Sequence, residues 1–83
     1  MLKVKIYSTV YQVSETASEM VKLHAVEPER IVEAIKEGAH EFDPHNRLYR
    51  YRRYWREEDG VIMLEVLVDE TNLIVTALKV DYD

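Results

Sequence analysis

The segment 61–68 constrains the fold of this chain more than any other part of the sequence. It reads Val-Ile-Met-Leu-Glu-Val-Leu-Val, so only one of its positions is polar. A short apolar run between turn signals is typical of a buried strand. A strand with one exposed face alternates apolar and polar side chains, whereas this one is apolar on both faces. We therefore expect a central strand whose second face is partly covered by a dimer partner, by the chain's own C-terminus or by a binding partner.

Three other segments are predicted to be strands. Residues 2–11 alternate apolar and polar side chains, and residues 47–56 are rich in Tyr and Arg. Residues 57–60 and 69–72 contain the Asp, Asn and Gly typical of turns, so residues 73–80 complete an antiparallel meander. The segment 39–46 has no clear pattern beyond a turn at its Asp-Pro-His-Asn end.

Two helices are predicted between the first two strands. The first begins at Ser14 or Thr16, and Thr16 with Glu19 three residues later fits a capping box. The second begins at Pro28, because proline lacks the N–H that would be unpaired at the first helical position. Gly38 is expected to end this helix in the left-handed conformation.

The element order β-α-α-β-β-β predicts an α+β fold of two layers, with a helical hairpin packed on a mainly antiparallel four-stranded sheet. The 83 residues (1–83) correspond to a single domain. The chain lacks cysteine, a membrane-spanning apolar run and a signal-peptide pattern at its start, so we expect a cytoplasmic protein with no membrane partner. Plentiful Lys and Glu, with few Asn and Gln, are typical of heat-adapted proteins.

Residues 13–20, 26–38 and 73–77 resemble a family of small bacterial and archaeal domains known as domain of unknown function 4258. That family is similar in fold to the RelE/ParE toxin superfamily, so the resemblance implies a RelE-like fold and a toxin-like context. Thr16 and Glu19 stand where the family usually has His and Arg, and its Arg-Gly pair between the helices is absent. No role for a histidine or arginine at those positions is therefore carried over.

The charge of the chain is unevenly distributed. Its net charge is −5, yet residues 47–56 contain five arginines and no acidic residue. Because alternate residues of a strand share a face, one side carries a row of guanidinium groups spaced about 6–7 Å apart, near the spacing of consecutive phosphates. The row predicts binding of RNA or another polyanion through Arg50, Arg52, Tyr54 and Arg56. Alternatively, these arginines balance the acidic residues of the sheet and helices, or bind an acidic protein partner.

Two further functions stay open from the sequence. One is a protein-interaction module, or a homodimer, without catalysis. The other is a weak toxin-like ribonuclease, in which Arg50, Arg52, Arg56, Tyr54 and Tyr82 take catalytic roles by analogy alone. The familiar toxins carry basic or aromatic residues near the C-terminus, whereas residues 79–83 are net acidic, which argues against an efficient nuclease.

The remaining candidate residues have structural interpretations. Tyr49, Tyr51 and Trp55 are expected to pack under the helices, and His24 is expected to be a partly buried packing or capping residue. His40 and His45 with Asp43 could ligate a metal, but their spacing matches no standard motif. The chain has two glycines and therefore no glycine-rich loop for a nucleotide. We predict neither a metal nor a cofactor.

Overall fold

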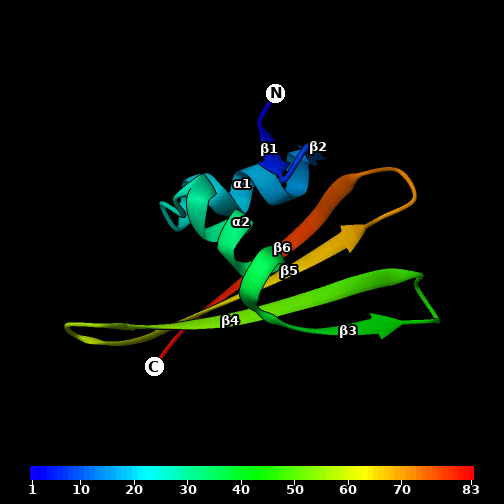
Figure 1. Cartoon of the computed structure of the whole chain (residues 1–83). Coiled ribbons are helices and arrows are strands. Elements are labelled where there is room, and N and C mark those ends of the chain that lie inside the picture. Colours follow the sequence, from blue (N-terminus) through cyan, green and yellow to red (C-terminus); the bar gives the residue numbers. More distant parts are fainter.

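The computed structural model describes residues 1–83 and places two helices and a hairpin against one face of a long twisted sheet (Figure 1). The strand order is β1-β2-β6-β5-β4-β3, and every neighbouring pair is antiparallel except β2 and β6. The elements are β1 (Lys3–Ile6), β2 (Thr9–Val13), α1 (Glu15–Leu23), α2 (Pro28–Glu37), β3 (Ala39–Asp43), β4 (Leu48–Glu57), β5 (Gly60–Asp69) and β6 (Ile74–Tyr82).

The fold is α+β, but the predicted four-stranded sheet is wrong because the sheet has six strands. The predicted strand 2–11 is a hairpin of β1 and β2, since the chain turns at Tyr7, whose φ is 56°. The alternation of apolar and polar residues continues through this turn, because β1 and β2 each bury every second side chain. The sixth strand, β3, was not predicted, because it is a largely exposed edge strand without alternating apolar side chains.

Each helix begins at a residue suited to a helix start, Ser14 as the N-cap of α1 and Pro28 as the first residue of α2. The Ser14 side chain accepts a hydrogen bond from the Ala17 N–H at 3.1 Å, so Ser14 caps α1 and the capping box at Thr16 does not form. Helix α2 begins at Pro28, as predicted. Ala17 of α1 and Ile31 of α2 are completely buried, which holds both helices against the sheet.

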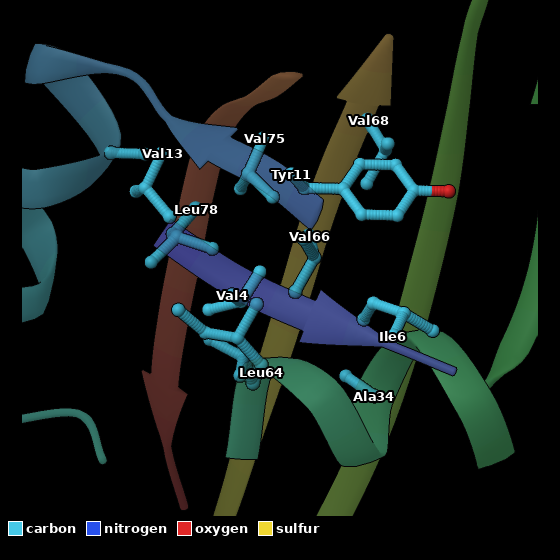
Figure 2. Close-up of a cluster of buried hydrophobic side chains, with 12 residues drawn as sticks. Val4, Ile6, Tyr11, Val13, Ala34, Leu64, Val66, Val68, Val75 and Leu78 are labelled. Carbon is cyan, nitrogen blue, oxygen red and sulfur yellow. The ribbon is translucent and has the colours of Figure 1, made fainter. Parts of the chain in front are cut away.

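The core lies between β5, β6, the helices and the β1–β2 hairpin. Only two residue pairs join β2 to β6. Figure 2 shows the hairpin crossing β5 and β6 obliquely, so its apolar side chains meet those of the longer strands. The buried residues are Val4, Ile6, Tyr11, Val13, Ala17, Ile31, Ala34, Leu64, Val66, Val68, Val75 and Leu78.

The opposite face of β4, β5 and β6 is covered by neither helix, and we call it the open face (Figure 1). Strand β5 is central, as predicted, with β4 and β6 on either side. The chain's own C-terminus does not cover its second face, because β6 continues the sheet. The open face comprises Arg50, Arg52, Tyr54 and Arg56 of β4, Val61, Met63, Glu65 and Leu67 of β5, and Lys79 and Asp81 of β6.

Gly38 ends α2 for a different reason from the one predicted. Its φ is −74° and its ψ is 161°, an extended conformation that any residue adopts. A Cβ at this position would lie 2.4 Å from the Ala34 carbonyl oxygen and 2.7 Å from that of Arg52. Glycine is therefore required because the end of α2 lies directly against the backbone of β4.

We predict that Gly38→Ala lowers the free energy of unfolding by about 1–3 kcal/mol, because the added methyl group must displace backbone atoms. Urea unfolding measures this change. Ala25→Gly is the matched control, since Ala25 has a φ of 49° in the turn between the helices. Glycine relieves its left-handed strain and should leave stability unchanged or raised. Equal stability of Gly38→Ala and the wild type would contradict the close approach.

Candidate functional site

Strand β4 divides its side chains between the two faces of the sheet as predicted. Arg53 Nη1 lies 3.0 Å from Glu33 Oε2 and 2.7 Å from Glu37 Oε2, and both carboxylates belong to α2. The Trp55 indole N–H also donates to Glu33, at 3.1 Å. Tyr51 and Trp55 pack against the core, which confirms their predicted place under the helices.

Tyr49 lies on the same face but further from the core. Its ring is 5.0 Å from that of Phe42 on β3 and 6.2 Å from that of Tyr51, measured between centroids. Tyr49 is half-buried beside Phe42 and Tyr51, on the helix side of the sheet. It is therefore not available for stacking on the open face.

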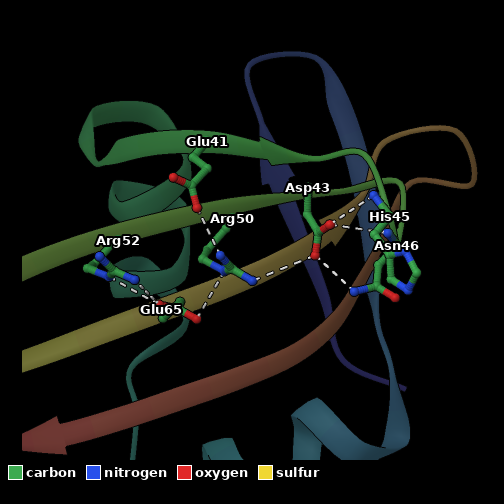
Figure 3. Close-up of polar contacts among 7 residues, drawn as sticks. All are labelled: Glu41, Asp43, His45, Asn46, Arg50, Arg52 and Glu65. Carbon is green, nitrogen blue, oxygen red and sulfur yellow. Dashed lines mark hydrogen bonds and ion pairs between the residues drawn. The ribbon is translucent and has the colours of Figure 1, made fainter.

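Two of the four predicted binding residues are engaged in a charge network on the open face (Figure 3). Arg50 Nη1 is 2.9 Å from Glu41 Oε1, and Arg50 Nη2 is 3.8 Å from Asp43 Oδ2. Arg50 Nε is buried and lies 3.4 Å from Glu65 Oε1, without the alignment of a hydrogen bond. Three carboxylates therefore surround this guanidinium group, as in the charge-balance interpretation.

Arg52 shares the central carboxylate of the same network. Its Nη2 lies 2.6 Å from Glu65 Oε2, and its Nε lies 3.1 Å from the same oxygen. These hydrogen bonds and the charge of Glu65 raise the pKa of Arg52 above its usual value. The side chain nevertheless keeps 45% of its surface exposed, so one side of the guanidinium group faces solvent.

The other two binding candidates occupy the far end of β4 and are free of carboxylates. Tyr54 is 61% exposed, and Met63 lies opposite it on β5. Arg56 is exposed and makes no ion pair. The candidate site thus has a charge-balanced half, formed by Arg50 and Arg52, and an unpaired half, formed by Tyr54 and Arg56.

Tyr82 does not join these residues. It lies opposite Ile62 in the register of β5 and β6, on the helix side of the sheet. Its hydroxyl group is 3.3 Å from His24 Nδ1, and His24 is the C-cap of α1, consistent with the capping role predicted for it. The five residues suggested for a ribonuclease by analogy are therefore split between the two faces.

The residues suggested as metal ligands have other roles. Asp43 Oδ1 accepts hydrogen bonds from the backbone N–H groups of His45 and Asn46, and Asp43 Oδ2 accepts one from the Asn46 side chain. The bonds from Asn46 are the main cause of a lowered pKa of Asp43. The His40 ring lies beside Tyr51, and no three His, Asp or Glu side chains converge as a metal site.

Glu70 is a polar residue that sequence reasoning missed. The hydroxyl groups of Tyr11 and Tyr51 donate to its two carboxylate oxygens at 2.7 and 2.8 Å. Burial, followed by the hydrogen bond to Glu70, raises the pKa of Tyr11 to about 12 and also raises that of Tyr51. The only signal in the sequence was that a buried tyrosine hydroxyl requires a partner.

Comparisons of the chain with protein-family models, with curated proteins and with solved structures find no match. Neither helix is long and apolar enough to cross a membrane.

The raised pKa of Tyr11, caused first by burial and then by the hydrogen bond to Glu70, predicts a loss of stability at high pH. The folded protein holds the Tyr11 proton more tightly than the unfolded chain, whose tyrosine titrates near pH 10. The resulting stabilisation is complete below pH 10 and is lost as the pH rises towards about 12. Urea unfolding at pH 9 and at higher pH should show a smaller decline for Tyr11→Phe than for the wild type. Parallel declines in the two proteins would contradict the assignment.

Proposed function

We propose that the open face binds single-stranded RNA, or a comparable polyanion, around Tyr54. The observation that carries the proposal is an exposed tyrosine flanked along the same strand and face by Arg52 and Arg56, on a sheet surface that no helix covers. A base stacked on an aromatic side chain contributes about 1–3 kcal/mol, whatever its identity, and flanking arginines can contact the adjacent phosphates.

The charge network limits which arginines can take part. Arg56 has no carboxylate partner, and Arg52 shares a single carboxylate while keeping an exposed side. Arg50 is surrounded by three carboxylates, so its role in this proposal is to hold Glu65 and β3 in place. The proposed contact surface is therefore Arg52, Tyr54 and Arg56, and it is smaller than the row predicted from the sequence.

The overall charge supports a weak interaction confined to this surface. The net charge of −5 repels a polyanion at a distance, and Asp81 lies on the same face as Tyr54. The proposal accordingly includes few phosphate contacts. The resemblance to domain of unknown function 4258 and to the RelE-like toxins is compatible with RNA as the ligand. Membership of the chain in that family is part of this proposal.

A titration of labelled single-stranded RNA, resolved on a gel that also reveals cleavage, tests this function. We expect Tyr54→Ala to weaken binding at least about five-fold through lost stacking, and Arg56→Glu to abolish it. Arg47→Glu is the matched control, because it makes the same charge change in the exposed turn before β4. This control should reduce affinity far less than Arg56→Glu.

If Arg47→Glu and Arg56→Glu lower the RNA affinity equally, the interaction is non-specific charge attraction and not binding at the proposed surface. An absence of binding by the wild type at low salt would assign the arginines to charge balance and overturn the proposal. Cleaved RNA that requires Tyr54 or Arg56 would instead support the toxin-like ribonuclease.

A second candidate function is self-association through the same face, favoured by its apolar centre. Val61, Met63 and Leu67 lie half-buried along the open side of β5, and the ion-paired Glu65 lies between Met63 and Leu67. Arg56 lies opposite Val61 on the β4 side, and Asp83 lies opposite Val61 on the other side. A two-fold axis along β5 would stack the apolar side chains and place Arg56 of one copy opposite Asp83 of the other, because both residues pair with Val61, as an isologous interface requires.

Sedimentation analysis of charge-swapped variants tests this arrangement. If the copies pair in this way, Arg56→Asp and Asp83→Arg should each be monomeric, whereas an equimolar mixture should form a heterodimer because the opposed charges are restored. A wild-type protein that is monomeric at high micromolar concentration would exclude the dimer and leave the open face available for RNA.

A further inference from the structure

The most enclosed pocket of the molecule lies on the helix side of the sheet, away from the open face. It has a volume of about 200 Å³ and is bounded by the turn between the helices and by the adjoining ends of β4, β5 and β6. Aliphatic side chains, including Ile62 and Val80, line much of its surface, and the Trp55 ring forms one wall. Glu27, Arg30 and Glu57 supply charged groups to its lining.

The charged groups of this pocket leave one carboxylate without a partner. Arg30 Nη2 forms an ion pair with Glu57 Oε1, and its guanidinium carbon lies 4.9 Å from the centre of the Trp55 ring. Glu27 makes neither an ion pair nor a side-chain hydrogen bond, although it is the N-cap residue of α2. His24 and Tyr82 also line the pocket, and the formal charges of Glu27, Arg30 and Glu57 sum to −1.

The surface beside the pocket is also acidic. An adjoining hollow shares Glu57, Ile62 and Tyr82 with the pocket and adds Asp59 and Asp83. No lysine, arginine or histidine lines this hollow. A concave surface lined by charges of one sign raises the local concentration of oppositely charged ligands, so the hollow attracts cations to the side of the pocket.

We infer that the pocket binds a small organic cation with an apolar body, such as a primary arylalkyl amine. A cavity of about 150 Å³ can hold benzene, so this pocket has room for one ring and a short chain. The ring would lie against Ile62 and Val80, since the guanidinium groups of Arg30 and Arg53 lie over the Trp55 ring. The ammonium group would face Glu27. This site is independent of the function proposed for the open face, because its residues lie on the other side of the sheet.

An NMR titration of the labelled protein with three probes of similar size tests the inference. Phenethylamine is the cation, phenylethanol the neutral analogue and phenylpropionate the anion. Trp55 is the only tryptophan, so its indole N–H gives a single signal from the pocket wall. We expect saturable shifts of this signal and of the Ile62 and Val80 methyl groups, with the amine binding about ten-fold more tightly than the carboxylate.

Three variants separate the contributions of charge and shape. Glu27→Gln should weaken amine binding about two- to five-fold and leave binding of the alcohol unchanged, because Glu27 is exposed and faces only the charged group. Val80→Phe should fill the pocket and abolish binding of all three probes. Glu27→Lys, which changes an exposed residue, should reverse the preference between amine and carboxylate even if Val80→Phe fails to fold.

The inference is overturned if no probe gives saturable shifts, if the carboxylate binds as tightly as the amine, or if Glu27→Lys leaves the preference unchanged. Tyr54→Ala should retain full amine binding, so loss of RNA binding in that variant and loss of amine binding in the Glu27 variants report on separate sites.

Discussion

The burial of one side of β5 is the interaction on which the rest of the structure depends. Leu64, Val66 and Val68 are almost completely removed from water beneath the helices and the β1–β2 hairpin. Burying side chains of this kind stabilises a fold by about 1.5–3 kcal/mol each. A shift of one residue in the pairing would exchange them with the residues of the open face, including Glu65, so the burial also fixes the register of β4.

This register determines what each face of the sheet can do. Once Val66 is buried opposite Tyr51, Arg52 must lie opposite Glu65, and Tyr54 opposite Met63, on the other side. The helix side then receives Trp55 and its neighbours, which close the small acidic pocket with the turn between the helices. The two proposed sites therefore follow from one pairing of strands, although they share no residue.

Local patterns in the sequence predicted the elements whose side chains alternate and whose ends carry a cap. The division of β4 into two faces and the start of α2 at Pro28 followed from such patterns. The turn at Tyr7 could not be predicted, because a left-handed tyrosine has no local signal and the alternation continues through it. The pairing of Arg53 with Glu33 and the contact of His24 with Tyr82 join distant segments, so they appeared only in the folded chain.

Folding also reduces the number of arginines in residues 47–56 that are free to bind a polyanion. Of its five arginines, Arg50, Arg52 and Arg53 are paired with carboxylates that lie far from them in the sequence or on another strand. Only Arg47 and Arg56 are without an ion pair, and they lie before and near the end of β4, respectively. The sequence of this segment resembles a strong polyanion site. After folding, the part that stays available for binding is short and lies around Tyr54.

The salt dependence of RNA affinity tests this account most directly. A single strand contacted by Arg52 and Arg56 alone should release counterions from about two phosphates, so the logarithm of the association constant should fall with the logarithm of the salt concentration with a slope of about −1.4. A slope of about −2.1 or steeper would show that all three arginines of the open face bind phosphates, which contradicts the charge network described for Arg50. A measurable affinity with the shallow slope would support the Tyr54-centred surface.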